Sequence, residues 1–299
     1  MIKQPPYLKK GDKIAIVCPA KKLPKRIDYA VSLLESWGLE VISGESVYAS
    51  HHQFAGTDKL RTADIQHFLD DPSVKAIICG RGGYGAIRII DQLNFSTFVD
   101  QPKWFIGFSD VTVLLSHIIA KTATQCMHAQ MPYTFDESTP EALSSLKKAL
   151  FGEQQSYEYV STFSNQPGNA QGVLIGGNLT LLTMLQGSAS EMDFDNKILF
   201  LEDVGEQEFS IDRMLRMLKR AGKLKNLSGL IIGAFNEIEE EKISFGQTAD
   251  EVIFDIVKEY DYPVCFNFPT GHIENNLAMV LGAEVALTVE KNNVYFKYL

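Results

Sequence analysis

A serine stands where a strand-like run is expected to pass directly into a helix. The apolar run 104–107 ends in glycine, Ser109 and Asp110 follow, and the pattern from residue 111 to residue 120 is helical. A turn of this kind exposes the serine hydroxyl and directs backbone N–H groups toward it. Ser109 is therefore a candidate nucleophile. The alternative is that Ser109 simply caps the helix, because Ser and Asp are favoured at that position.

An acid and a histidine follow two further strand-like runs. Glu202 comes directly after the apolar run 198–201, and His272 lies shortly after the run 264–268. Because ligands of open parallel sheets bind at the carboxyl ends of the strands, these residues are candidates for one shared site. The alternative for Glu202 is that it is exposed to solvent, as most acids at strand ends are. Among the six histidines, the main competitor of His272 is His128, in an irregular stretch.

A glycine-rich turn joins another expected strand and helix. Residues 79–85 read Cys-Gly-Arg-Gly-Gly-Tyr-Gly and formally match the dinucleotide fingerprint G-x-G-x-x-G. Two strand–helix units precede this turn, and the acid expected about 20 residues further on is absent, so dinucleotide binding is disfavoured. Glycine lets a backbone approach a reacting carbonyl, so the turn could supply amides to an oxyanion hole. A plain tight turn is the alternative.

Together these residues supply the groups that acyl transfer needs. A serine hydroxyl becomes an effective nucleophile when a neutral imidazole takes its proton, and a carboxylate then orients and stabilises that imidazole. Ser109, His272 and Glu202 fit these three roles. The sequence has no H-E-x-x-H, no Cys/His cluster and no aspartate-rich loop, so we expect neither a metal nor a cofactor.

Short apolar runs alternate with amphipathic segments in the first half of the chain, which predicts an α/β fold with a parallel sheet covered by helices. The expected strands lie near residues 13–18, 39–42, 74–79 and 104–107. A polar, turn-rich stretch at 161–169 interrupts the pattern, and we place a domain boundary there, giving domains 1–164 and 165–299. The second half resumes the alternation and should end in a hairpin that turns at Asn292-Asn293.

Bulk composition excludes several kinds of partner. The 299 residues carry a net charge of −9 without a strong basic cluster, so we expect no nucleic-acid partner. The sequence shows neither a signal peptide nor the run of about 20 apolar residues that a membrane span needs, so we expect a cytoplasmic protein without membrane contact. The four cysteines are far apart and mostly lie in apolar runs, which is typical of core residues.

Several short motifs, in order along nearly the whole chain, resemble the LD-carboxypeptidase family of serine peptidases, also called muramoyltetrapeptide carboxypeptidases. The motifs lie at residues 8–15 with 19–20, 81–85, 107–110, 176–179, 200–204 with 211–215, and 271–272. The resemblance implies a flavodoxin-like N-terminal domain, a smaller mixed α/β C-terminal domain and a Ser-Glu-His triad at their junction.

The resemblance also implies a role for each site residue. Ser109 would be the nucleophile, Glu202 the orienting acid and His272 the base. The oxyanion hole would consist of backbone amides, those of Asp110 and of Gly82 or Gly83. Family members typically release the terminal D-alanine of murein tetrapeptides in the cytoplasm, during peptidoglycan recycling, and are commonly homodimers that need no metal. The expected partner is thus a small muropeptide. Arg81 is a candidate for binding the terminal carboxylate of this peptide. The alternative is that Arg81 is an ordinary surface arginine beside a turn.

The chain departs from the family pattern at two places. Ala129-Gln130 replaces a Gly-Pro, and Ile273 follows the histidine where glycine is common. A related branch hydrolyses a peptidyl- or aminoacyl-nucleotide antibiotic, a task that favours an exposed aromatic side chain. Trp37 and Trp104 read as core, so the murein substrate is favoured. A non-catalytic nucleotide-binding module is the alternative from a different class.

Overall fold

The first of two β-sheets has the strand order β11-β5-β4-β3-β1-β2 in the computed structural model, which describes residues 2–238 and 243–299. Its strands are β1 (Lys13–Val17), β2 (Glu40–Ser43), β3 (Val74–Cys79), β4 (Trp104–Gly107), β5 (Cys126–His128) and β11 (Met279–Leu281). Strands β1 to β5 pair in parallel, and β11 pairs antiparallel to β5. The order 2-1-3-4-5 is that of flavodoxin-like folds, so the predicted fold class is confirmed.

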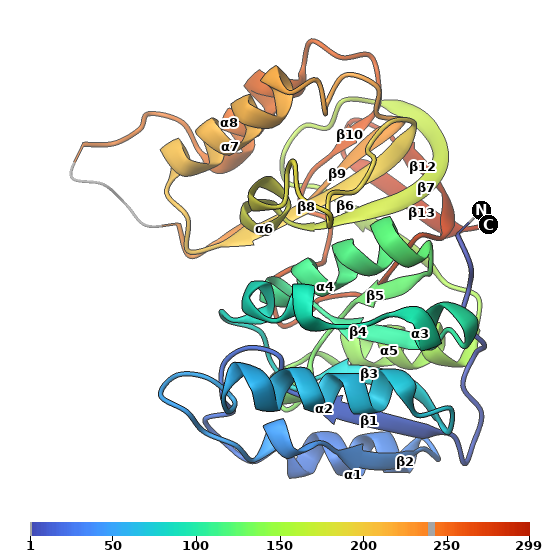
Figure 1. Cartoon of the computed structure of the whole chain (residues 1–299). Coiled ribbons are helices and arrows are strands. Elements are labelled where there is room, and N and C mark those ends of the chain that lie inside the picture. The colour runs from blue at the N-terminus through green and yellow to red at the C-terminus, as the bar shows by residue number, and fades with distance from the viewer. Residues whose placement is uncertain (1, 239–242) are drawn as a thin grey trace.

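Helices lie on both faces of this sheet (Figure 1), and alternating side chains of its strands point toward the two layers. Ala15 and Val17 join one apolar cluster and Ile14 and Ile16 the other, as the two-residue period of a strand requires. One face is covered by α2 (Asp58–Asp70), α3 (Ser96–Asp100) and α4 (Thr112–His117), and the other by α1 (Asp28–Ser36) and α5 (Pro140–Phe151). Burial on both faces explains why the strands are continuously apolar.

The second sheet is mixed, with the order β10-β9-β8-β7-β12-β13-β6. Its strands are β6 (Ser156–Val160), β7 (Gly168–Asn178), β8 (Lys197–Val204), β9 (Gly229–Asn236), β10 (Val264–Cys265), β12 (Glu284–Val289) and β13 (Asn293–Tyr298). Strands β7 to β10 run parallel, and the predicted C-terminal hairpin is confirmed by β12 and β13. The helices of this half are α6 (Leu179–Met184), α7 (Glu208–Arg220) and α8 (Ala249–Val257).

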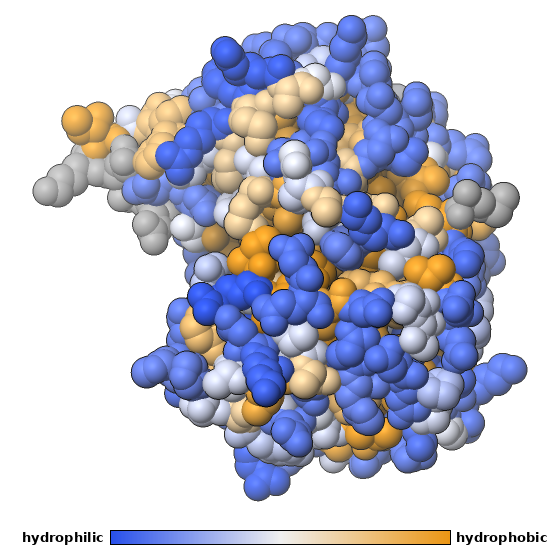
Figure 2. All heavy atoms as spheres, in the orientation of Figure 1, coloured by the Kyte–Doolittle hydropathy of each residue, from blue (hydrophilic) through white to orange (hydrophobic). Residues whose placement is uncertain are grey.

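Each sheet takes one strand from the other half of the sequence. Strand β6 precedes the expected boundary at 164/165 yet joins the second sheet, and β11 follows that boundary yet joins the first. The boundary itself stays a prediction. The two halves share one of the apolar clusters, and apolar atoms also gather in the hollow between them (Figure 2). All four cysteines and both tryptophans are buried, as predicted.

Strand β7 approaches its neighbours so closely that only glycine fits at one position. Gly176 has φ +143°, and a Cβ atom there would overlap the backbone of Phe200 on β8. We expect Gly176→Ala to lower the free energy of unfolding by roughly 2–4 kcal/mol, measured by denaturant titration. Gly172→Ala in the same strand is the matched control, because its Cβ would meet nothing nearer than 3.4 Å. Equal losses in the two variants would contradict this explanation.

Candidate active site

Ser109 lies on a strained turn at the end of β4, where a short 3-10 helix (Ser109–Val111) leads into α4. Its φ of +62° is uncommon for a residue with a side chain. No helix amide donates to its hydroxyl group, and this hydroxyl has no hydrogen bond to any residue that the structure describes. The side chain therefore does not act as an N-cap and is available to a substrate.

The glycine turn after β3 lies directly against this serine. A Cβ atom on Gly82 would lie 3.0 Å from the Ser109 Cβ and 3.3 Å from the Asp110 amide nitrogen, so the backbone passes where a side chain could not. Among the described residues, the amides of Gly82 and Gly83 donate no hydrogen bond. The turn thus presents unused N–H groups beside a hydroxyl, which is what an oxyanion hole requires.

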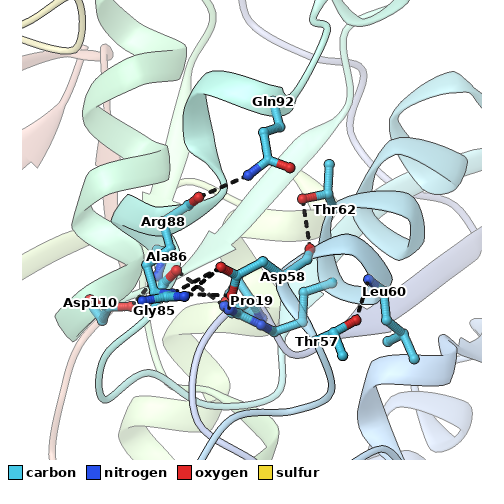
Figure 3. A network of polar contacts seen from close by, with 11 residues as sticks. Pro19, Thr57, Asp58, Leu60, Thr62, Gly85, Ala86, Arg88, Gln92 and Asp110 are labelled. Carbon is cyan, nitrogen blue, oxygen red and sulfur yellow. Dashed lines mark hydrogen bonds and ion pairs between the residues drawn. The ribbon is translucent and has the colours of Figure 1, made fainter. Parts of the chain in front are cut away.

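A buried polar network holds the glycine turn (Figure 3). The carboxylate of Asp110 accepts a hydrogen bond of 2.8 Å from the Ala86 amide, and burial raises the pKa of this carboxyl group. Arg61, which is 0% exposed, donates to the carbonyl oxygens of Gly85 and Pro19. The sequence analysis missed both roles. For Asp110 it considered only the backbone amide and not the carboxylate. Arg61 was overlooked because an arginine in an amphipathic helix usually faces water.

Glu202 and His272 form a buried ion pair at the carboxyl end of β8. The Nδ1 atom of His272 lies 2.7 Å from Oε2 of Glu202, whose side chain is 0% exposed. Burial alone would raise the pKa of Glu202, but the attraction of His272 outweighs it and the pKa is lowered. Burial would likewise lower the pKa of His272, and Glu202 instead raises it. The contact depends on Gly271 (φ +118°), where a Cβ atom would lie 3.0 Å from that of Glu202.

Two amide side chains to which the sequence analysis assigned no role hold the loop of His272. Asn236, at the end of β9, donates to the His272 carbonyl oxygen at 2.7 Å. Gln130 donates to the carbonyl oxygens of Ile273 and Glu274, each at 3.1 Å. Gln130 and Ile273 are the two departures from the family pattern, and here they contact each other. A polar residue after a buried strand was the available signal for Asn236.

A cavity of about 500 Å³ opens beside His272, with a volume in the range that small-molecule sites occupy. The Phe108 ring lines this cavity and lies 4.9 Å from the ring of His272. Three carboxylates, those of Glu137, Glu237 and Glu274, also line it. No hydrogen bond joins Ser109 to His272 in the described part of the chain, and such contacts often tighten only when substrate binds.

Within the residues that the structure describes, no group of three His, Cys, Asp or Glu side chains could hold a metal ion. None of the described helices has the length and apolar character that crossing a membrane demands.

A serine on a strained turn, free amides beside it and a buried carboxylate–imidazole pair can together support acyl transfer to a serine. The family comparison agrees with this class of chemistry. Residues 14–129 match the LD-carboxypeptidase N-terminal domain and residues 171–287 the C-terminal domain, so the chain belongs to the LD-carboxypeptidase family.

Individual relatives cover almost the whole chain. A probable murein peptide carboxypeptidase of Bacillus subtilis is 35% identical, over 97% of this chain and 93% of its own length. The crystal structure of a muramoyltetrapeptide carboxypeptidase from Oxalobacter formigenes is 27% identical, with a TM-score of 0.87 and coverage of 96% and 98%. The microcin C7 self-immunity protein MccF also has a TM-score of 0.87, with coverage of 98% of both chains. Because it is only 23% identical to this chain, this likeness shows the shared fold alone.

The raised pKa of His272 predicts how activity depends on pH. A general base must be neutral, so we expect the acid limb of kcat/KM to have its midpoint above 6.5, the ordinary value for histidine. Glu202→Gln removes the charge that raises this pKa, so the limb should move to lower pH while kcat falls by roughly three orders of magnitude or more. A limb below 6.5 in the wild type, or one that Glu202→Gln leaves in place, would contradict the pairing.

Proposed function

We propose that this protein is a serine-type LD-carboxypeptidase that releases the terminal D-alanine of murein tetrapeptides. The observation that carries the proposal is the buried pair of His272 and Glu202, 2.7 Å apart, in the same junction as the strained turn of Ser109. The family and the names of its relatives supply the substrate class.

In the proposed reaction, Ser109 Oγ attacks the carbonyl carbon before the terminal D-residue. His272 Nε2 takes the hydroxyl proton and later gives it to the leaving amine, while Glu202 holds the Nδ1 proton and fixes the tautomer. The amides of Asp110 and of Gly82 or Gly83 receive the developing oxyanion. Water then attacks the acyl-enzyme with His272 again as base, and the shortened peptide leaves.

The positive charge of Arg81, in the glycine turn beside Ser109, suits a peptide with a free carboxyl end. Arg81 stacks on the Tyr133 ring at 4.7 Å and donates to the Lys22 carbonyl oxygen at 3.0 Å. Among the described residues no carboxylate pairs with Arg81, so its charge remains available to a ligand. We propose that Arg81 binds the terminal carboxylate of the substrate, since a buried anion requires a charged partner.

The self-immunity branch is the less supported alternative. Its proposed substrate carries a nucleobase that an exposed indole could stack on, and the two tryptophans of this chain are 7% and 1% exposed. A cytoplasmic location and a homodimeric state are further parts of the proposal, and both rest on the family resemblance. Light scattering during size-exclusion chromatography measures the oligomeric state.

We expect Ser109→Ala to abolish D-alanine release from disaccharide-tetrapeptide, with a loss of several orders of magnitude in kcat, because the triad residues act as a unit. Substrate binding and the melting temperature should change little. Ser116→Ala, on the adjacent helix α4, is the matched control and should keep its activity. Retention of more than about a tenth of the activity in Ser109→Ala would remove Ser109 as the nucleophile.

We expect amidation of the substrate's terminal carboxyl group to lower kcat/KM at least about tenfold, matching one charge-assisted contact of roughly 1.5–3 kcal/mol. Arg81→Ala should lower kcat/KM for the free acid by a similar factor and leave the amide unaffected. Lys22→Ala is the control, because this neighbouring lysine is exposed and bonds to Ser50. Equal turnover of acid and amide would indicate an endopeptidase or an amidase.

A further inference from the structure

Asp110 follows the nucleophile directly, and its carboxylate makes a contact that the proposed reaction does not use. The side chain is 3% exposed. Its Oδ2 atom accepts a hydrogen bond of 2.8 Å from the amide of Ala86, which lies 24 residues earlier, at the end of the glycine turn. The carboxylate therefore joins the turn that carries the nucleophile to the turn that carries proposed oxyanion donors.

Arg61 holds the same peptide group from its other end. The carbonyl oxygen of Gly85 accepts a hydrogen bond of 3.1 Å from Nη1 of Arg61, whose side chain is 0% exposed. This oxygen and the Ala86 N–H belong to one peptide group, the clamped peptide. The clamped peptide thus lies between a buried guanidinium and the buried carboxylate of Asp110 (Figure 3).

Opposite charges at its two ends fix the direction of the clamped peptide. A peptide group has a dipole of about 3.5 D, whose positive end is the N–H. Here the N–H faces the carboxylate of Asp110, and the oxygen faces the guanidinium of Arg61. A flipped peptide would place like charges in contact, which is costly in a buried environment. The guanidinium also packs on the backbone, because a Cβ atom on Gly85 would lie 2.7 Å from Nη1 of Arg61.

The middle of the glycine turn has few contacts of its own. Its first residue, Gly80, is held by a backbone hydrogen bond of 2.7 Å to β1. Among the described residues, the amides of Gly82 and Gly83 donate no hydrogen bond, and the Gly82 carbonyl oxygen accepts one of 3.4 Å from Lys21. The position of these two amides therefore depends on how the ends of the turn are held, and the second end is the clamped peptide.

We propose that Asp110 and Arg61 are positioning residues of the oxyanion hole. By fixing the clamped peptide from its two ends, they hold the amides of the glycine turn at the distance from Ser109 that a tetrahedral oxyanion requires. This inference rests on the acyl transfer of the proposed function. Asp110 then serves the site twice, because its own amide is one donor and its carboxylate places the other.

A carboxylate this close to an oxyanion would oppose catalysis unless its charge were compensated. Arg61 supplies the compensating charge on the other side of the clamped peptide. Burial raises the pKa of Asp110, and the charge of Arg61 acts against this rise. Arg61 also pairs with Asp58, which pairs in turn with Arg88 at 2.7 Å. These two cations and two anions fix the backbone without leaving a net negative charge beside the oxyanion.

The first test separates turnover from ground-state binding. Asp110→Ala removes the acceptor of the Ala86 amide, so kcat for D-alanine release should fall about 30-fold or more, while KM changes less than about threefold. A tripeptide boronic acid, with boron in place of the scissile carbonyl carbon, forms a tetrahedral adduct with a serine. Its affinity should fall by a similar factor as kcat. The affinity for intact tetrapeptide, measured by calorimetry in the Ser109→Ala background, should stay within about threefold.

Asp64→Ala is the matched control for the loss of a buried acceptor. Asp64 is 8% exposed, lies on the same helix as Arg61 and accepts the backbone amides of Glu45 and Ser46, each at 3.0 Å. Its replacement should lower the melting temperature but keep kcat within about twofold of the wild type. Equal losses of kcat in Asp64→Ala and Asp110→Ala would overturn the proposal, as would equal losses of affinity for the boronic acid and the tetrapeptide.

Asp110→Asn provides a second variant if Asp110→Ala does not fold. Its amide oxygen can still accept from Ala86, but the charge that faces Arg61 is gone. The affinity for the boronic acid should therefore fall about threefold to tenfold, which is less than in Asp110→Ala, while the affinity for the tetrapeptide stays the same. An affinity for the boronic acid equal to that of the wild type would contradict the positioning role.

Hydrogen exchange of the Ala86 amide, measured by NMR in the Ser109→Ala protein, is a readout that needs no turnover. Asp110 is the partner of this amide in the described structure. Asp110→Ala should therefore accelerate its exchange about tenfold or more beyond what the change in global stability accounts for. Asp64→Ala should cause no such acceleration. An Ala86 exchange rate that does not depend on the Asp110 carboxylate would refute the role.

These readouts separate the inference from the proposed function. A fluorophosphonate probe forms a P–O bond to an activated serine and releases fluoride. If the wild type does not cleave the tetrapeptide, but Asp110→Ala slows labelling of Ser109 and accelerates exchange of Ala86, the substrate assignment fails and the positioning role stands. If cleavage occurs and a folded Asp110→Ala protein keeps its kcat, the function stands and the inference fails.

Discussion

The buried carboxylate of Glu202 constrains everything around it. Removing a charge from water costs several kcal/mol unless a partner compensates it, and here the partner is His272. The pair can form only if the loop after β10 passes close to β8. Glycine at position 271 allows this approach, as does Gly233, where a Cβ atom would lie 2.7 Å from the Thr270 carbonyl oxygen. Burial of one acid thus dictates backbone contacts in three separate segments.

The nucleophile belongs to one sheet and the acid–base pair to the other, so their geometry depends on the junction. Several contacts hold this junction, and two of them bear directly on the site. The Asn178 amide donates to Thr112 Oγ1 at 3.2 Å, joining β7 to the helix after Ser109. The chain after His272 then crosses back to form β11 beside β5. The loop of the base is consequently anchored in the nucleophile's own sheet, which a simple two-domain division would not provide.

Local pattern was sufficient to predict the parallel sheet and the strand-end positions of Ser109, Glu202 and His272, because both follow from apolar runs and their ends. It could not show the exchange of β6 and β11, since pairing between distant short strands leaves no local signal. The burial of Arg61 and of His128 was missed for a related reason. The sequence suggested an exposed position for Arg61 and an irregular stretch for His128, which instead ends strand β5. Only tertiary contacts reveal that both side chains are fully buried.

The pH range in which the acid–base pair stabilises the fold differs from the range in which the site is active. The lowered pKa of Glu202 means that its ionised form stabilises the fold above its unfolded-state pKa, and this stability is lost as the pH falls through the folded value. The raised pKa of His272 has the opposite sign, so its contribution is present at low pH and disappears as the pH rises through the folded value. The pair is thus fully stabilising only between the two unfolded-state pKa values, where Glu202 is ionised and His272 is charged. Catalysis requires the neutral imidazole, so the site works on the alkaline side of this window. At that pH the ion pair is lost, and the contacts of Asn236, Gln130 and Asn276 must hold the loop of His272 instead.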